Sequence, residues 1–369
     1  MKLILLKTNI VEGLFSVERA TGINTNLPVL KNILLSAQNN KISITATNLE
    51  LAITHTIQGK IIENGRAVMP AVLFGSVIKN LNSERITIET NENTVRVITD
   101  NYEATIQGGN EKDFPIIPHV SDVKNSIRVA VDVFLESLGS TIIATQYSDI
   151  RPEISGVFFT YSNEKLTFVG TDSFRLAEKI ISGSGVASTF DEVSFIIPLQ
   201  TAEELMRVIQ KSDDEVTIHT DQNQVFFITK TKFVTSRTVD GRFPEYQPII
   251  PKSTENEISI NRQELLNAIK LVSSFSGRTN DITISVGENK KFIEISSQEG
   301  SLGSSVYKVP SKVKGEIFSV VFNWKYLYDG LRIYSSDEII LGVNTPDKPA
   351  VIRDPKEPSL LYVVMPIRK

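Results

Sequence analysis

Catalytic or metal-binding chemistry would have to rest on few residues in this sequence. It holds three histidines, His55, His119 and His219, and no cysteine. No histidine lies four positions from another, so the sequence offers no pair of ligands on one helical face for a zinc ion. Without cysteine there is no thiolate nucleophile, cysteine metal site or disulfide. His55 and His219 fall in expected strands, where ordinary core or surface histidines are the interpretation.

Two polar clusters remain as candidates for acid–base or metal chemistry. Thr171-Asp172-Ser173 with Arg175 lacks a partner base at local spacing, so an enzyme that uses Asp172 and Arg175 is the less favoured alternative. Asp213-Asp214-Glu215 follows an expected helix, and we expect a solvated turn there. Gly183-Ser-Gly opens no helix and is expected to be a flexible hairpin, not a dinucleotide loop. The sequence therefore predicts no catalytic residue, metal or cofactor.

The composition is that of a soluble globular protein. A length of 369 residues is that of two to three ordinary domains. Hydrophobic residues make up 41% and charged residues 22%, close to an average globular protein. Lys and Arg total 39 against 43 Asp and Glu, giving a net charge of -4. Overall charge therefore does not favour tight binding to a polyanion. No apolar run is long enough to span a bilayer or to form a signal peptide, so we expect a cytoplasmic protein with no membrane partner.

The elements that must position these residues repeat three times along the chain. Thr47 recurs as Thr171, which is 124 positions further on, and the third copy aligns Ile269 with Leu138. A period near one third of the chain length predicts three domains of similar fold. Their expected bounds are 1–119, 126–252 and 253–369.

Each copy divides again into two halves with the same order of elements, a strand, a helix and three strands. The strands are predicted from period-two alternation of Val, Ile, Thr and Phe. The helices, such as one over 71–81, are predicted from apolar residues three and four positions apart. Asn39-Asn40 and Asn163-Glu164 lie between strand pairs and indicate hairpin turns. The pattern predicts an α+β chain of six half-repeats in three similar domains.

Three segments resemble those of the bacterial DNA polymerase III beta subunits, the sliding clamps. They are Gly170-Thr-Asp-Ser-Phe-Arg-Leu-Ala177, Val239-Asp-Gly-Arg-Phe-Pro-Glu-Tyr246 and Tyr362-Val-Val-Met-Pro-Ile-Arg368. Leu27-Pro28-Val29-Leu30 and Arg151-Pro152-Glu153-Ile154 also fit, so the resemblance spans the whole chain. It implies the DNA clamp fold and a head-to-tail dimeric ring with helices inside and sheets outside.

The same resemblance implies a processivity factor with no catalytic activity and no cofactor. It would encircle double-stranded DNA without sequence preference and tether other proteins through short peptides. The implied partners are a clamp loader, replicative and translesion DNA polymerases, and mismatch-repair and ligase-type clamp-binding proteins. The alternative is a DNA-binding or peptide-binding scaffold that forms no ring.

A partner-peptide pocket is implied at the junction of the second and third domains. Its residues combine an apolar patch with arginines, which suits a peptide with aliphatic or aromatic anchors and a polar end. Ser173, Phe174 and Pro248 depart from the family, where Gly, His or Tyr, and a basic residue occur. Val364 is expected to face its own domain instead, because strand residues alternate. The pocket residues, carried over position by position, are Arg151, Ile154, Thr171, Ser173, Phe174, Arg175, Leu176, Pro244, Pro248, Ile249, Val363, Met365, Pro366, Ile367 and Arg368.

A DNA-facing surface is expected on the helices, although it matches the family less well. Asn24, Val72 and Ser148 stand where relatives supply Arg or Gln. For each basic residue an ordinary solvated helix charge is the alternative. The DNA-facing candidates are Arg19, Asn24, Lys79, Ser148, Arg207, Lys211, Arg262 and Lys270.

Helix packing predicts that one chain cannot enclose DNA. Helices pack about 8–10 Å apart, so six in a ring leave no room for a duplex, whereas twelve leave a hole of roughly 28 Å once a helix diameter of about 10 Å is subtracted. Two chains joined head to tail need two different surfaces. The resemblance places these surfaces at an edge strand over 102–106, with Ala104 and Ile106, and around Ser274 and Phe275.

Overall fold

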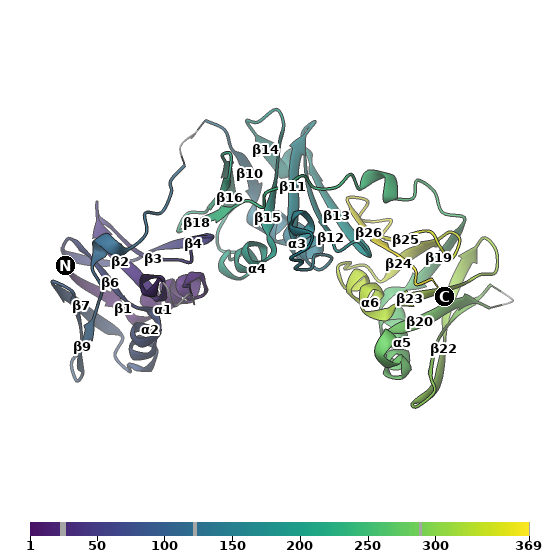
Figure 1. The fold of residues 1–369 in the computed structure, drawn as a ribbon, viewed down its shortest axis with the longest axis horizontal. Helices are drawn as coiled ribbons and strands as arrows, with labels where there is room; N and C mark the ends of the chain where they lie inside the picture. The colour runs from purple at the N-terminus through teal and green to yellow at the C-terminus, as the bar shows by residue number, and fades with distance from the viewer. Residues whose placement is uncertain (23–26, 121–123, 288–289, 369) are drawn as a thin grey trace. The chain divides into compact units, whose positions relative to one another are not determined.

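The computed structural model describes residues 1–22, 27–120, 124–287 and 290–368. Figure 1 shows the helices and strands along the chain. Internal contacts divide the chain into two units, which are described separately. Unit 1 comprises Met1–Leu135, Gly185–Phe190 and Glu203–Thr238. Unit 2 comprises Glu136–Ser184, Asp191–Ala202 and Val239–Lys369.

The first third of the chain contains the predicted half-repeat twice. The first half is β1 (Lys2–Leu6), α1 (Lys7–Val17), β2 (Asn32–Gln38), β3 (Lys41–Thr47) and β4 (Leu51–Ile57). A further strand, β5 (Gly59–Glu63), pairs with β1. The second half is β6 (Gly65–Pro70), α2 (Ala71–Asn80), β7 (Arg85–Asn91), β8 (Thr94–Ile98) and β9 (Glu103–Gln107). The strand–helix–three-strand order is therefore confirmed here.

The middle third repeats this order. Its first half is β10 (Ile127–Ala130), α3 (Val131–Ile142), β11 (Gly156–Ser162), β12 (Lys165–Thr171) and β13 (Arg175–Ser182). Its second half is β15 (Val193–Pro198), α4 (Leu199–Val208), β16 (Glu215–Thr220), β17 (Gln224–Ile228) and β18 (Lys232–Arg237). The hairpin expected at Gly183 is instead a 3-10 turn, Gly183–Gly185, which leads into a short strand, β14 (Val186–Ser188), that pairs with β10.

The last third follows the same plan. Its first half is β19 (Asn256–Asn261), α5 (Arg262–Val272), β20 (Asp281–Val286), β21 (Phe292–Glu299) and β22 (Gly303–Lys314). Its second half is β23 (Ser319–Asn323), α6 (Trp324–Arg332), β24 (Glu338–Val343), β25 (Ala350–Arg353) and β26 (Leu360–Val364). The described residues therefore confirm the predicted α+β fold of three similar domains.

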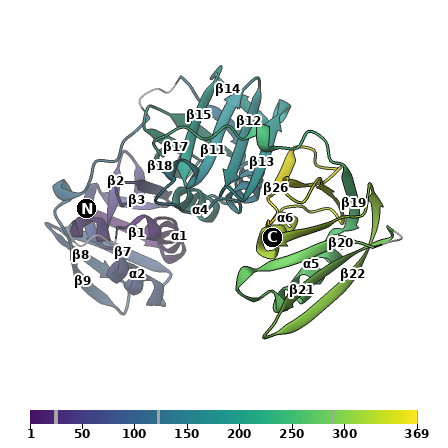
Figure 2. The same ribbon diagram turned by 45° about the vertical axis from the view of Figure 1, so that its right-hand side comes forward.

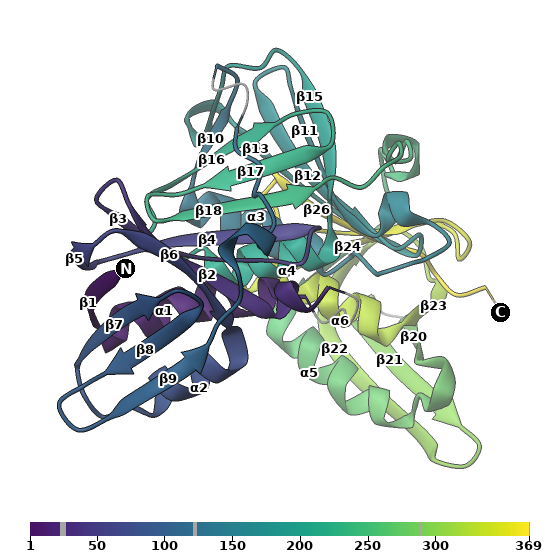
Figure 3. The same cartoon turned by 60° about the vertical axis from the view of Figure 1, so that its left-hand side comes forward.

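Two strand pairs, each in a different sheet, join strands of neighbouring domains. In unit 1, β4 pairs antiparallel with β18, which places Lys232 opposite His55 (Figure 3). In unit 2, β13 pairs antiparallel with β26, which places Leu176 opposite Val363 (Figure 2). The ends of these two strand pairs are the places where loops of different domains meet.

Helix α5 shows why the spacing of apolar residues predicts these helices. Leu265, Ile269 and Val272 lie on one face and are all buried, and burial of each such side chain contributes about 1.5–3 kcal/mol. Asn261 caps the helix, because its side chain accepts a hydrogen bond from the Glu264 N–H at 2.9 Å. The apolar face predicted from sequence is confirmed.

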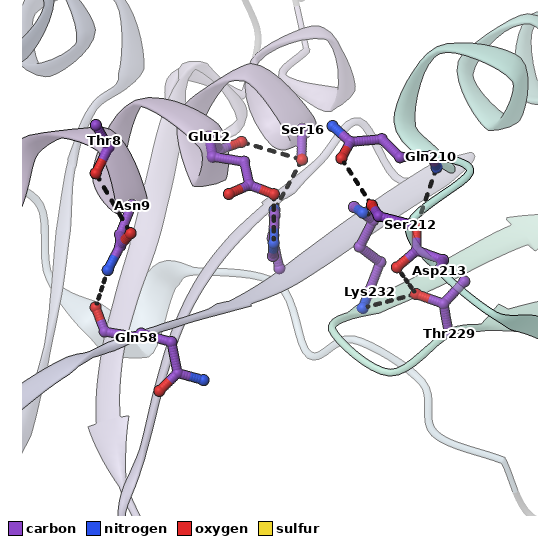
Figure 4. A network of polar contacts seen from close by, with 11 residues as sticks. Thr8, Asn9, Glu12, Ser16, Gln58, Gln210, Ser212, Asp213, Thr229 and Lys232 are labelled. Atoms are coloured by element: carbon purple, nitrogen blue, oxygen red, sulfur yellow. Dashed lines mark hydrogen bonds and ion pairs between the residues drawn. The ribbon is translucent and has the colours of Figure 1, made fainter.

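A buried polar network links α1 to the β4–β18 pair in unit 1 (Figure 4). His55 is 2% exposed, and its Nδ1 lies 2.8 Å from Ser16 Oγ on α1. Across the strand pair, Lys232 Nζ lies 2.8 Å from Asp213 Oδ2, and Thr229 Oγ1 donates to Asp213 Oδ1 at 3.0 Å. The network therefore places an imidazole beside a buried ion pair.

The solvated turn expected at Asp213-Asp214-Glu215 is wrong for its first residue. Asp213 is 4% exposed, whereas Asp214 and Glu215 are exposed. Burial of a carboxylate requires a paired cation and hydrogen bonds. Lys232, which is itself 2% exposed, supplies that cation from the next hairpin.

His55 should make the stability of unit 1 depend on pH. Burial lowers the pKa of His55, and the Lys232 charge lowers it further, against weaker opposing effects of Glu12 and Asp213. The unfolded chain binds a proton near the ordinary value of 6.5, so stability should fall as pH falls from 7.5 to 5.5. The slope for one group is at most about 1.4 kcal/mol per pH unit.

Urea unfolding of the parent chain and of His55→Gln across this pH range measures the effect. The variant should lose the slope that His55 contributes, whereas His119→Gln, which alters an exposed histidine, should keep it. Equal slopes for the parent and for His55→Gln would contradict the assignment.

Candidate functional site

A tight turn after β12 in unit 2 orients the first group of predicted pocket residues. Thr171 Oγ1 donates to the Arg175 carbonyl at 2.7 Å and accepts from the Ser173 N–H at 3.2 Å. Asp172 Oδ1 accepts from the N–H groups of Phe174 and Arg175 at 2.9 and 3.0 Å. Ser173 has a φ of 77°, a left-handed conformation that glycine adopts more easily. The turn leaves Phe174 58% exposed.

Arg175 is held between two carboxylates. Its Nε lies 2.9 Å from Asp172 Oδ2, and its Nη1 lies 2.6 Å from Asp329 Oδ2 on α6. The guanidinium also lies 4.6 Å from the centre of the Tyr326 ring, a cation–π contact. Burial alone would lower the pKa of Arg175, but its contacts with Tyr362 and with the Asp329 and Asp172 carboxylates together raise it.

Three hydrogen bonds hold the Asp172 carboxylate in this arrangement. Its Oδ1 accepts two backbone N–H groups and its Oδ2 accepts the Arg175 guanidinium. A general base needs a lone pair directed at the proton that it removes. Arg175 pairs with both Asp172 and Asp329, so these contacts hold the turn against α6.

Beside this turn lies a cavity of about 40 Å³, which we call the C-terminal pocket. Leu176 and Val363 are 4% and 3% exposed and form its floor, opposite one another on β13 and β26. The Met365 N–H donates to the Phe174 carbonyl at 2.8 Å, which fixes the chain end beside the turn. The lining residues are Thr171, Ser173, Phe174, Arg175, Leu176, Ile249, Ile250, Val363 and Met365.

The structure brings most, but not all, of the predicted pocket residues together. Arg151 and Ile154 lie next to the cavity: Arg151 Nη1 donates to Ser173 Oγ at 2.9 Å, and Ile154 packs in a buried cluster with Leu176 and Val363. The Ile367 N–H donates to the Val321 carbonyl, which directs the chain end toward β23. The predicted residues that do not line the cavity are Arg151, Ile154, Pro244, Pro248, Pro366, Ile367 and Arg368.

Sequence reasoning missed three residues of this site. Ile250 lines the cavity. The segment Pro248-Ile-Ile-Pro251, which also contains the predicted Ile249, could have indicated it. Tyr326 stacks on Phe174 with ring centres 6.4 Å apart, and Asp329 pairs with Arg175. No local sequence pattern connects either residue with the turn, because both lie on α6, far from the turn in the sequence. The prediction for Val364 is confirmed, since it is fully buried in the core of the last domain.

The basic side chains among the DNA-facing candidates differ in their exposure and in their ion-pair and hydrogen-bond partners. Lys79 Nζ pairs with Glu18 at 2.8 Å on an exposed surface, and Lys270 is exposed on α5. The side chain of Arg207 is 13% exposed, because it pairs with Glu204 and donates to the carbonyls of Phe15 and Ser16 in unit 1. Arg207 therefore holds α4 against α1.

Two of these candidates do not lie on α-helices as expected. Arg19 lies in the 3-10 turn Glu18–Ala20, because α1 ends at Val17. Lys211 lies beyond α4, which ends at Val208. Both remain exposed, with side chains 65% and 83% accessible.

The other candidates occupy a helix start, a loop and a segment that is not described. Arg262 begins α5, and its Nε donates to the Ser336 carbonyl at 2.8 Å. Ser148 lies in the loop after α3, where its Oγ accepts from the Arg151 N–H at 3.1 Å. Asn24 lies outside the described residues.

The candidate dimer surfaces also differ in exposure. β9 is the last strand of the sheet β5-β1-β7-β8-β9, so the edge position predicted for 102–106 is confirmed. Ile106 is nevertheless 2% exposed, whereas Ala104 is half-buried. Ser274 is exposed and Phe275 is half-buried in the 3-10 turn Ser273–Phe275.

Within the described ranges, no three His, Asp or Glu side chains are grouped as they would be around a metal ion. The helices of these same ranges are all too short or too polar to cross a membrane.

Comparison with known proteins matches the whole chain to one family. Models of the N-terminal, central and C-terminal domains of the DNA polymerase III beta subunit match residues 1–118, 128–245 and 247–368. The beta sliding clamp of Synechococcus elongatus is 26% identical over 374 residues, covering 100% of this chain and 99% of the relative. That of Bacillus subtilis is 26% identical, with 100% of both chains covered.

Solved structures agree with the sequence comparison. The crystal structure of the DNA polymerase sliding clamp from Bacillus subtilis superposes with a TM-score of 0.93 at 25% identity, covering 100% of this chain and 99% of that one. A putative DNA polymerase III beta subunit from Eubacterium rectale superposes with a TM-score of 0.92 at 25% identity, with 100% of both chains covered.

Proposed function

The chain belongs to the DNA polymerase III beta subunit family and functions as a sliding clamp of DNA replication, and on this premise we propose that two copies close head to tail around duplex DNA. The domains of each copy are 1–119, 126–252 and 253–369. The ring works in the cytoplasm as a processivity factor, without catalytic activity of its own.

The observation that carries the ring is the six-fold repetition of one half-repeat, each with a single helix from α1 to α6. Helices packed about 8–10 Å apart require twelve such units, and therefore two chains, to surround a duplex. β9 ends its sheet and offers the hydrogen-bonding groups of an edge strand. Because Ile106 is buried, the main chain of β9 and Ala104 make one half of the contact, and Ser274 and Phe275 make the other.

Partner proteins bind at the C-terminal pocket through a short peptide. The apolar floor at Leu176 and Val363 receives a Leu-Phe-like end, and Arg151, at the rim, faces the polar part. A glutamine side chain matches such a polar rim. The clients are a clamp loader, replicative and translesion polymerases, and mismatch-repair and ligase-type proteins.

DNA contacts in the ring are few and weak. Arg19, Lys79, Lys211 and Lys270 keep exposed charges, whereas Arg207 and Arg262 donate to main-chain carbonyls. Each phosphate contact adds to the salt dependence of binding, so a clamp with few contacts slides freely. Retention then depends on enclosure, because escape requires ring opening or a DNA end.

Retention on circular and linear DNA tests this function. After loading by a partner ATPase, the protein should stay on closed circular DNA through moderate salt and leave within seconds once the circle is cut. Gel filtration of the DNA-bound fraction measures retention, and light scattering of the free protein at micromolar concentration should give a dimer. Equal retention on both forms, with salt removing both, or a monomer by light scattering, would contradict the ring.

A further inference from the structure

A turn in unit 1 repeats the four side-chain-to-backbone hydrogen bonds that form the turn of the C-terminal pocket. Thr47 Oγ1 donates to the Leu51 carbonyl and accepts from the Leu49 N–H, both at 3.0 Å. Asn48 Oδ1 accepts from the N–H groups of Glu50 and Leu51 at 3.0 and 2.8 Å. Leu49 has a φ of 77°, the same as Ser173. Residues 47–51 are therefore the structural counterpart of residues 171–175.

The surroundings of the two turns repeat as well. The Arg237 N–H donates to the Glu50 carbonyl at 2.9 Å, as the Met365 N–H donates to the Phe174 carbonyl at 2.8 Å. Ala52 lies opposite Thr235 on β4 and β18, as Leu176 lies opposite Val363 on β13 and β26. The segment Pro115-Ile-Ile-Pro118 recurs as Pro248-Ile-Ile-Pro251.

These elements enclose a cavity of about 120 Å³, which we call the N-terminal pocket. It is larger than the C-terminal pocket, because Ala52 and Thr235 stand in the places of Leu176 and Val363. Its volume equals the share of about four liquid waters at roughly 30 Å³ each, enough for one branched aliphatic side chain. The lining residues are Thr47, Leu49, Glu50, Leu51, Ala52, Pro115, Ile116, Ile117, Pro118, Gln224, Thr235 and Arg237.

One buried group in the lining is left for a ligand. Thr235 is 5% exposed, and within the described residues its Oγ1 has no hydrogen-bond partner. A buried hydroxyl without a partner is costly and uncommon. Because Oγ1 is itself covered, a peptide main chain in the cavity would reach it after rotation of the Thr235 side chain.

The rim of the N-terminal pocket has different chemistry from that of the C-terminal pocket. Glu50 and Arg237 replace the apolar pair Phe174 and Met365, and they form an ion pair of 3.4 Å in which both side chains are more than half exposed. Exposed pairs of this kind exchange partners easily. Leu49 and Ile116 are 50% and 94% exposed beside them and provide apolar cover.

We propose that the N-terminal pocket is a second peptide-docking site, which binds an extended segment with an aliphatic side chain followed or preceded by a carboxylate. The aliphatic side chain fills the cavity over Ala52, Thr235 bonds the peptide main chain, and Arg237 exchanges Glu50 for the peptide carboxylate. The cavity over Ala52 and the exposed Arg237 beside it together favour such acidic segments at the N-terminal pocket. The inference rests on the proposed peptide binding of the C-terminal pocket, because it treats the two pockets as structural counterparts with the same kind of ligand.

The two isoleucine pairs allow both pockets to be observed in one sample. Methyl NMR of the full chain, labelled at isoleucine, reports on Ile116 and Ile117 at one pocket and on Ile249 and Ile250 at the other. The probes are two blocked peptides, acidic Ac-Ser-Leu-Asp-Leu-Ser-NH2 and neutral Ac-Gln-Leu-Ser-Leu-Phe-NH2. The acidic probe should shift the first pair of methyls and the neutral probe the second.

Two substitutions test the mechanism of the N-terminal pocket. Arg237→Glu should weaken the affinity for the acidic probe at least tenfold and leave the affinity for the neutral probe unchanged. Ala52→Leu introduces the side chain found at the corresponding Leu176. It should abolish binding of the acidic probe, because the leucine fills the cavity. Lys314→Glu makes the same charge change at an exposed residue of unit 2 and should affect neither probe.

Each result separates this inference from the proposed function. Shifts at Ile249 and Ile250 with none at Ile116 and Ile117 would overturn the second site and support the first. An unchanged acidic titration in Arg237→Glu would overturn the role of charge. Absence of any shift at Ile249 and Ile250 with the neutral probe would contradict peptide binding at the C-terminal pocket itself.

Discussion

Deleting residues 365–369 should reduce the affinity for a glutamine-containing peptide with a Leu-Phe end at least about 100-fold, from the micromolar range expected for the intact chain. Met365 forms one wall of the C-terminal pocket, and its N–H fixes the Phe174 carbonyl. Removing that wall opens the cavity to water over the buried floor of Leu176 and Val363, where an apolar anchor gains its free energy.

The fold should survive this deletion. The main-chain hydrogen bonds that hold the segment run from Met365 to Phe174 and from Ile367 to Val321, and each contributes about 1 kcal/mol. Residues 365–367 are only half-buried and Arg368 is exposed, so the loss of stability should stay at about 2 kcal/mol. Fluorescence anisotropy with a labelled peptide measures the affinity, and thermal unfolding followed by circular dichroism measures the stability.

Matched variants identify the cause of the loss. Phe174→Ala should weaken the peptide less than the deletion does, because this half-exposed ring stacks on Tyr326 at the rim. Ile317→Ala removes an equally exposed apolar side chain that does not line the pocket and should leave the affinity unchanged. A truncated chain that binds as tightly as the intact one would place the peptide site elsewhere.

Local patterns predicted the elements of the fold because each half-repeat is built from short-range periodicity. The helix face at Leu265 and Ile269 follows from spacing alone, and so does the opposite orientation of Val363 and Val364. Helix ends were predicted less well. Arg19 and Lys211 fall past the ends of α1 and α4, since charge alone does not mark where the backbone leaves the helix.

The site could be predicted only in part, because its key contacts join residues far apart in sequence. Arg175 is 154 positions from Asp329 and carries no local sign of that pairing. Asp213 was expected in water for the same reason, because its lysine comes from the following hairpin. The resemblance supplied Met365 and Ile249, while Tyr326, which no motif marks, required the structure.

Replacing Lys232 by methionine should destabilise unit 1 by about 3–5 kcal/mol. The substitution keeps most of the side-chain volume but removes the cation that neutralises Asp213, a carboxylate only 4% exposed. The hydrogen bonds from Thr229 Oγ1 and the Gln210 N–H remain, and they do not supply a charge. Urea unfolding and hydrogen exchange of the β4–β18 strand pair measure the change.

The loss should shrink as the pH falls. In the parent chain, burial alone would raise the pKa of Asp213, but the hydrogen bond from Lys232, with its charge, outweighs burial and lowers it below the ordinary value of 3.8. Stability from this pair is therefore present above that value and is lost as the pH falls through the lower folded-state pKa. Without Lys232, burial should raise the pKa of Asp213, so the variant recovers by protonating the carboxylate between pH 7 and 4.

A double substitution separates lost attraction from the cost of a stranded charge. Lys232→Met with Asp213→Asn removes both charges and keeps an acceptor for Thr229, so it should regain at least about 2 kcal/mol of the loss. Lys211→Met, which alters a lysine 83% exposed beside Asp132, should change stability by less than about 0.5 kcal/mol. If the double variant is no more stable than Lys232→Met, packing of the lysine stem, and not charge neutralisation, holds this strand junction together.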